Sequence, residues 1–141
     1  MGSAIKVFLQ KSRLPTVEAW NAAIKAAGFD LVLDPADLRE DDGYLPATWE
    51  GEDSGFEWYL APLADLEVAP PGDTTPADVQ ALLCFTSQAA EDVVSCVAAA
   101  VLAKLTDGFY WDAETEPQMH RGDAAIGAAQ KIVQDWRSRA S

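Results

Sequence analysis

Basic residues are scarce through most of this chain. Between Ala26 and Ala103 a single base, Arg39, stands among sixteen carboxylates, and the 141 residues together carry a net charge of −13. A surface this acidic repels the phosphates of nucleic acids and acidic lipid headgroups, and it attracts basic protein surfaces. We therefore expect no nucleic-acid or membrane partner and favour a basic protein as the partner.

Long apolar runs are also missing. No stretch approaches the ~20 apolar residues of a membrane-spanning helix, and Lys6 interrupts the short apolar run near the N-terminus, unlike a signal peptide. Cysteine is limited to Cys84 and Cys96, too few for the disulfide framework of a small secreted protein. We expect a cytoplasmic protein in which both thiols are reduced and lie in the core.

Catalytic and cofactor-binding motifs are absent from the sequence. The glycines form neither a dinucleotide-binding nor a phosphate-binding pattern, and no nucleophile elbow occurs. His120, the single histidine, stands in a polar stretch and is expected at the surface. Two cysteines and one distant histidine make a poor zinc-ligand set. We expect no cofactor, no metal site and no enzymatic activity.

One acidic stretch approximates a calcium-binding loop. Leu38 and Trp49 occupy the first and last ligand positions of that loop, where carboxylates are required. The match therefore fails at both ends. The alternative of an adventitious cation at Glu40, Asp41 and Asp42 stays open.

Hydrophobic periodicity predicts six strands and three helices. The strands are expected over residues 4–10, 29–33, 44–50, 56–61, 79–86 and 109–111. The helices are expected over 17–27 with Thr16 as N-cap, over 89–105 with Ser87 as N-cap, and from Asp123 as N-cap to near the C-terminus. This order predicts a single-domain α+β fold over residues 1–141, a two-layer sandwich with a mixed or antiparallel sheet and about three helices mainly on one face.

The predicted hairpin over residues 44–61 carries the most specific constellation. Carboxylates crowd its expected five-residue connector, residues 51–55, and aromatic side chains alternate with them along both strands. Aromatic residues anchor protein interfaces, and carboxylates pair with Arg and Lys and speed encounter. Together with two acids of the preceding loop, they form the predicted partner-binding set, which comprises Asp41, Asp42, Glu50, Glu52, Asp53, Glu57, Trp49, Trp58 and Tyr59.

Four other interpretations stay open. Trp49 and Trp58 can face the core, leaving the acids as a solvated turn, and the acidic loop over residues 34–42 can serve solubility alone. Glu50 and Glu57 can act as an acid–base pair in a small enzyme, which needs two carboxyls roughly 5–9 Å apart. The chain can also be a housekeeping domain whose acidity has no partner.

The sequence resembles the small acidic cytosolic immunity proteins of bacterial polymorphic-toxin and contact-dependent systems. The segments that carry the resemblance are residues 14–20, 28–31, 43–47, 55–59 and 103–108. The resemblance implies stoichiometric inhibition of a cognate toxin without a cofactor. It does not assign a functional role to any individual residue of this chain. Our leading hypothesis is therefore a non-enzymatic binding protein that neutralises a basic partner by covering or plugging its active site.

Overall fold

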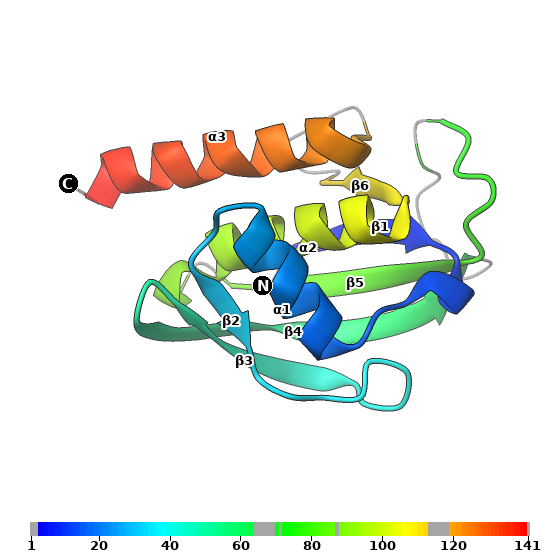
Figure 1. The fold of residues 1–141 in the computed structure, drawn as a ribbon, viewed down its shortest axis with the longest axis horizontal. Helices are drawn as coiled ribbons and strands as arrows, with labels where there is room; N and C mark the ends of the chain where they lie inside the picture. The colour runs from blue at the N-terminus through cyan, green and yellow to red at the C-terminus, as the bar shows by residue number, and fades with distance from the viewer. Residues whose placement is uncertain (1–2, 64–69, 71, 87, 113–118, 141) are drawn as a thin grey trace.

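The computed structural model describes residues 3–63, 70, 72–86, 88–112 and 119–140. Six strands form one antiparallel sheet in the order β2-β3-β4-β5-β1-β6, and the helices pack on it (Figure 1). The strands are β1 (Ser3–Leu9), β2 (Leu31–Leu33), β3 (Gly43–Trp49), β4 (Glu52–Pro62), β5 (Val79–Phe85) and β6 (Phe109–Trp111). The helices are α1 (Val17–Ala26), α2 (Glu91–Thr106) and α3 (Gly122–Ala140), with short 3₁₀ turns η1 (Lys11–Arg13) and η3 (Gln88–Ala90). The predicted α+β class, element order and helical layer are confirmed.

The first helix starts as predicted, and the second does not. The Thr16 side chain accepts a hydrogen bond from the backbone N–H of Ala19 at 3.1 Å, which satisfies one free donor of α1. The N-cap of α2 is Ala90, which has a left-handed φ of 61° and no side-chain cap hydrogen bond. Ser87, the predicted cap, lies outside the described residues. The carboxylate of Glu91 instead accepts from the backbone N–H of Thr86 at 3.0 Å, joining the start of α2 to the end of β5.

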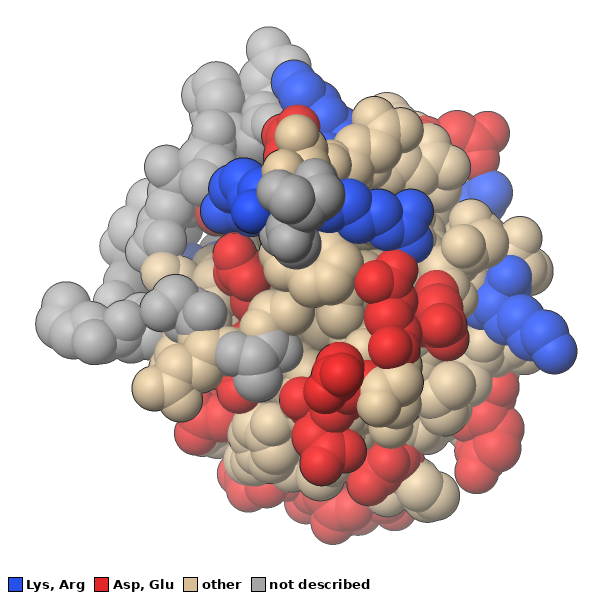
Figure 2. Space-filling model, turned by 90° about the vertical axis from the view of Figure 1, so that its left-hand side faces the viewer, with Lys and Arg blue, Asp and Glu red and all other residues tan. Residues whose placement is uncertain are grey.

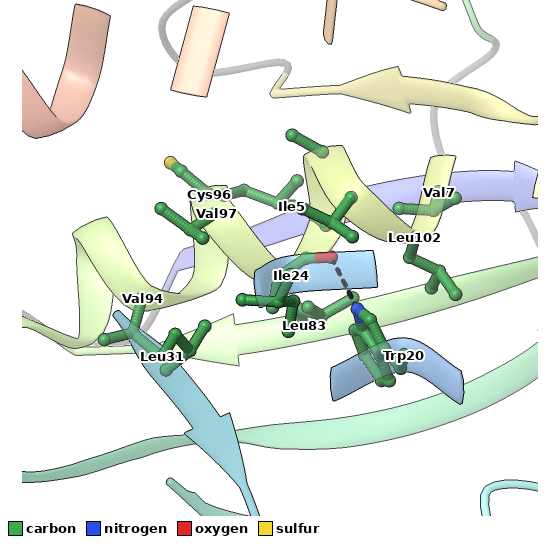
Figure 3. Close-up of a cluster of buried hydrophobic side chains, with 14 of the residues drawn as sticks. Ile5, Val7, Trp20, Ile24, Leu31, Leu83, Val94, Cys96, Val97 and Leu102 are labelled. Carbon is green, nitrogen blue, oxygen red and sulfur yellow. Dashed lines mark hydrogen bonds between the residues drawn. The ribbon is translucent and has the colours of Figure 1, made fainter. Parts of the chain in front are cut away.

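Helix α2 lies at the centre of the core. It is buried along most of its length, with α1 and the sheet on one side and α3 on the other (Figure 1). Trp20 of α1 is fully buried and donates from Nε1 to the backbone carbonyl of Ala98 at 3.1 Å (Figure 3). The alternating residues Ile5 and Val7 of β1 face the same cluster. Of the described helices, none is long and apolar enough to cross a lipid bilayer.

Hydrogen bonds cover parts of the two outer strands of the sheet. The amide of Asn21 on α1 donates to the carbonyl of Leu33 at 3.0 Å and accepts from its N–H at 2.8 Å, so it imitates a neighbouring strand. At the opposite edge, Tyr110 and His120 exchange two backbone hydrogen bonds of 2.8 Å. Exposed strand edges invite pairing with other chains. These contacts therefore protect both edges of the sheet.

The second face of the sheet is covered only in part. Phe8, Phe109 and Trp111 form a small apolar cluster on that side of β1 and β6. Lys6 and Arg121 lie over the rings of Trp111 and Phe109, at 5.7 and 4.4 Å from the ring centroids. On β2 and β3 this face carries exposed side chains, and the candidate site lies there.

Candidate functional site

The hairpin between β3 and β4 is tighter than the sequence predicts. The expected connector over residues 51–55 is wrong, because β4 begins at Glu52 and only Glu50 and Gly51 join the strands. Both turn residues have positive φ, 48° and 85°. That is the backbone of a type I′ turn, whose twist matches paired antiparallel strands. Glu52 and Asp53 therefore belong to a strand, and their side chains point to opposite faces.

Trp49 and Trp58 face the core, and each is only 2% exposed. Trp58 donates from Nε1 to the carbonyl of Leu38 at 3.0 Å, and its ring centroid lies 5.5 Å from that of Trp20. Trp49 packs edge-on against Trp136, 5.8 Å between centroids. The expectation that these two tryptophans anchor a partner does not hold, because neither presents surface. The alternative that they face the core is confirmed.

The opposite face of the hairpin presents a different aromatic residue. Tyr44 is 55% exposed and lies directly across the strand pair from Glu57. Val32 of β2 is also 55% exposed, and it shares this face because it pairs with Thr48, which lies on the same side of β3 as Tyr44. The predicted set omits Tyr44 and Val32. The sequence does hold a signal for Tyr44, since alternation from Leu45 and Trp49 places it on the face away from the core.

Tyr44 is held in one position on this surface. Its hydroxyl donates to the carbonyl of Ser54 at 2.9 Å, and its ring crosses Gly55 of the neighbouring strand. Partial burial raises the pKa of Tyr44 above its usual value, and the negative charges of Glu91 and Asp53 raise it further because they repel a phenolate. The tyrosine thus stands in a negative electrostatic environment.

Tyr59 extends the same face along β4. Its hydroxyl donates to a carboxylate oxygen of Glu57 at 3.0 Å. This hydrogen bond is the main cause of the raised pKa of Tyr59, and the negative charge of Asp42 raises that pKa slightly further. Tyr59 pairs with Leu82 of β5, which is half-buried. The predicted residues Glu57 and Tyr59 therefore do come together, as an acid and a phenol on one surface.

The tip of the hairpin is tied to the C-terminal helix. Arg137 of α3 donates from Nη2 to Glu50 Oε1 at 2.6 Å, two residues that are 87 positions apart in sequence. Figure 2 views this end of the molecule, where acidic side chains gather across the middle and bottom and basic ones lie above and to one side. Glu52 and Asp53 are exposed and, among the described residues, form no ion pair. Glu50 is therefore already neutralised within the chain, and its two neighbours are not.

The acidic loop between β2 and β3 is ordered by its own side chains. Asp41 accepts from the N–H of Asp37 at 2.9 Å, and Asp37 accepts from the N–H of Arg39 at 3.0 Å. Arg39 reaches back to the carbonyl of Leu14 at 3.2 Å, and Leu38 is buried under the hairpin. The loop is thus pinned to the body of the protein, and part of its acidity serves its own structure.

A shallow hollow separates this loop from β3. It has a volume of about 250 Å³ and is lined by Asp37, Asp41 and Asp42 on one side and by Tyr44 and Trp58 on the other. Neither Glu50 nor Glu57 lines it. Five residue pairs separate the turn from the Tyr44–Glu57 pair, so Glu57 lies about 20 Å along the strand from the turn. That distance exceeds the spacing an acid–base pair needs, so the geometry does not favour Glu50 and Glu57 as such a pair.

The remaining reactive side chains lie elsewhere. Both cysteines are free thiols, and Cys96 is buried in the core as predicted. The prediction is wrong for Cys84, which is half-buried and pairs with Glu57, on the face of the sheet away from the helices. Burial raises the pKa of Cys96 to about 12, although a hydrogen bond from Tyr110 opposes this shift. His120 is half-buried beside Tyr110, with ring centroids 6.1 Å apart, and is not the exposed residue that the sequence suggests. A buried thiol with a raised pKa is a poor nucleophile.

The described side chains bring no three His, Cys, Asp or Glu residues together in a metal-binding arrangement. In particular, Glu40, Asp41 and Asp42 do not form one within that part of the chain. Searches against models of protein families, curated proteins and solved structures found no match for this chain.

Proposed function

We propose that this chain is a non-enzymatic binding protein that neutralises a basic protein partner. The observation that carries the proposal is a set of exposed carboxylates on the acidic loop and the hairpin. Asp41, Asp42, Glu52, Asp53 and Glu57 are all exposed, and in the described part of the chain none forms an ion pair with Lys or Arg. Unpaired charge of one sign on a folded surface accelerates the encounter with a partner of opposite sign.

The scaffold supports a binding role because it fixes the backbone from which these side chains project. The type I′ turn fixes the register of the hairpin, so Asp53 and Glu57 share one face of β4. Leu38 and Arg39 anchor the acidic loop beside that hairpin. A preorganised surface loses little conformational entropy when a partner binds.

We further propose that the partner is a toxin and that this chain is its immunity protein, acting by covering the toxin's active site. The resemblance of the sequence to small acidic immunity proteins supports this step. Enzymes that act on nucleic acids carry basic clefts, and spaced carboxylates on a rigid surface complement such a cleft. No cofactor is needed for inhibition of this kind.

Purification of the tagged chain from its native host tests the proposal. We expect one basic protein to co-purify in equimolar amount, to arrest growth when expressed alone and to be harmless when co-expressed with this chain. A variant that carries Glu52→Gln, Asp53→Asn and Glu57→Gln should lose protection, and Glu18→Gln on the exposed surface of α1 should keep it. Protection that survives the triple substitution would refute the role of the acidic surface.

A further inference from the structure

The proposed function requires a basic partner but does not say which part of this surface the partner covers. The carboxylates point in several directions, since the loop, the hairpin tip and the sheet face are all acidic. Exposed apolar side chains are fewer than exposed carboxylates, and they therefore indicate a particular part of the surface. Among the described residues, the large hydrophobic side chains that are well exposed are Val32, Tyr44 and Leu105.

Two of these three residues share one surface. Val32 on β2 and Tyr44 on β3 lie on the face of the sheet opposite the helices, separated by Pro46 and Thr48, which are also exposed. Leu105 belongs to α2, in the helical layer. The face of β2, β3 and the first half of β4 away from the helices, here called the open face, thus exposes two large apolar side chains, and Glu91 at the start of α2 adds negative charge beside Tyr44.

Carboxylates border the apolar part of the open face. The cross-strand partner of Thr48 is Asp53, and that of Tyr44 is Glu57. Two residues further along β4, Tyr59 donates its hydroxyl to Glu57, which fixes that carboxylate beside the aromatic rings. An apolar centre bordered by acids is complementary to an apolar side chain flanked by Arg or Lys.

Tyr44 has the properties of an interface hot spot. Its hydroxyl is bonded to the Ser54 carbonyl, and its ring rests on Gly55, so little rotamer freedom remains to be lost on binding. Half of its surface is still exposed. An arginine that stacks on this ring can pair with Glu57 at the same time, which combines a cation–π contact with a charge-assisted hydrogen bond.

We propose that the open face docks a protein segment in which arginine or lysine alternates with apolar side chains, with Tyr44 and Val32 at the centre of the contact. This inference rests on the proposed function, because it takes the partner to be a basic protein. It adds that the partner lies flat on the sheet and does not contact chiefly the hairpin tip or the acidic loop. Charge complementarity and the location of the exposed apolar residues carry it.

Two synthetic peptides of equal charge test this docking surface on the full chain. One repeats Arg-Leu-Gly-Arg, and the other repeats Arg-Ser-Gly-Arg the same number of times. Backbone amide shifts are followed by NMR at about 150 mM salt, where surface charges more than ~8 Å apart are screened. We expect the leucine peptide to bind at least about threefold more tightly and to shift amides around Val32, Tyr44 and Glu57.

Two substitutions to lysine provide the matched comparison. Val32→Lys should weaken binding of the leucine peptide about tenfold, because it places a positive charge in the docking surface. Leu105→Lys likewise replaces an exposed apolar side chain with lysine, but in the helical layer, and should leave the affinity unchanged. Tyr44→Phe keeps the ring and should retain most of the affinity, whereas Tyr44→Ser should lose about tenfold.

The outcomes separate this inference from the proposed function. Shifts confined to the acidic loop and hairpin tip, with equal peptide affinities for Val32→Lys and Leu105→Lys, would overturn the docking surface. They would not contradict the proposal of a basic partner. Shifts spread evenly over all exposed carboxylates, Glu18 included, would contradict both proposals, whereas no binding of either peptide would overturn the docking surface. Amide spectra of the variants, unchanged away from each substituted residue, confirm that each variant is folded.

Discussion

The ring of Tyr44 occupies the space that a side chain at position 55 would need. A Cβ atom built on Gly55 would lie 2.5 Å from the Tyr44 hydroxyl oxygen and 2.6 Å from the backbone carbonyl oxygen of Leu45. The φ of Gly55 is 150°, which residues with side chains rarely adopt. The glycine therefore permits the close approach that holds the tyrosine flat on the sheet, an arrangement in which an aromatic ring covers a strand glycine.

Gly55→Ala should displace Tyr44 and destabilise the protein. We expect the free energy of unfolding to fall by about 2 kcal/mol or more, since backbone strain adds to the steric clash. Gly51→Ala provides the control, because Gly51 also has positive φ but a Cβ added there would meet no atom within 4 Å. That variant should lose only about 1 kcal/mol. Urea denaturation measures both values, and equal losses would argue against the Tyr44–Gly55 contact.

Asn21 should prove important for the edge strand. Asn21→Ala removes the donor to and the acceptor from Leu33, so both backbone groups of Leu33 lose their partner. We expect a loss of about 1–3 kcal/mol in unfolding free energy. The uncovered edge of β2 should also promote association at high concentration, which light scattering detects. Ala22→Ser, at the next and exposed position of α1, should do neither.

The Glu50–Arg137 pair should contribute little stability by itself. Both side chains are partly exposed, at 28% and 59%, so Arg137→Ala should cost less than about 1 kcal/mol. Glu50 also has a left-handed φ of 48°, which asparagine tolerates better in a type I′ turn. In the Arg137→Ala background, Glu50→Asn should therefore raise the free energy of unfolding. A decrease there, measured in urea, would show that Glu50 has another role.

Stability should decline at alkaline pH because of Cys96. Its thiol has a pKa of about 12 in the folded protein, against 9.0 for the ordinary group, so folding favours the protonated form. The stabilisation is complete below pH 9 and is lost as pH rises from about 9 towards 12, by at most about 1.4 kcal/mol per pH unit. Urea unfolding at pH 8 and pH 10 tests this. Cys96→Ala should flatten the decline, and an unchanged slope would assign it to other groups.

Much of the fold follows from local patterns in the sequence. Alternation places Ile5 and Val7 of β1 on the core face, and Thr16 marks the start of α1. The apolar run of β5 correctly predicts a central strand. The hairpin turn escapes prediction because Glu-Gly lacks the Asn-Gly or Asp-Gly signal of a type I′ turn, and glutamate rarely takes positive φ.

The candidate site is less predictable than the fold. Trp49 and Trp58 are suited by residue type either to a core or to an interface, and only the packing against Trp20 and Trp136 decides between them. The pairing of Glu50 with Arg137 depends on where α3 ends in space, which no local pattern contains. The exposure of Val32 likewise cannot be predicted from the sequence, because strand residues can be apolar on either face.

The most direct test of the central claim is the salt dependence of the association rate with the co-purified basic partner. We predict that the rate for the unmodified chain falls at least about tenfold between about 50 and 500 mM salt. For the variant with Glu52→Gln, Asp53→Asn and Glu57→Gln, we predict a slower rate at low salt and a weaker salt dependence. A rate that is indifferent to salt and equal for both proteins would contradict the claim that the acidic surface recruits the partner.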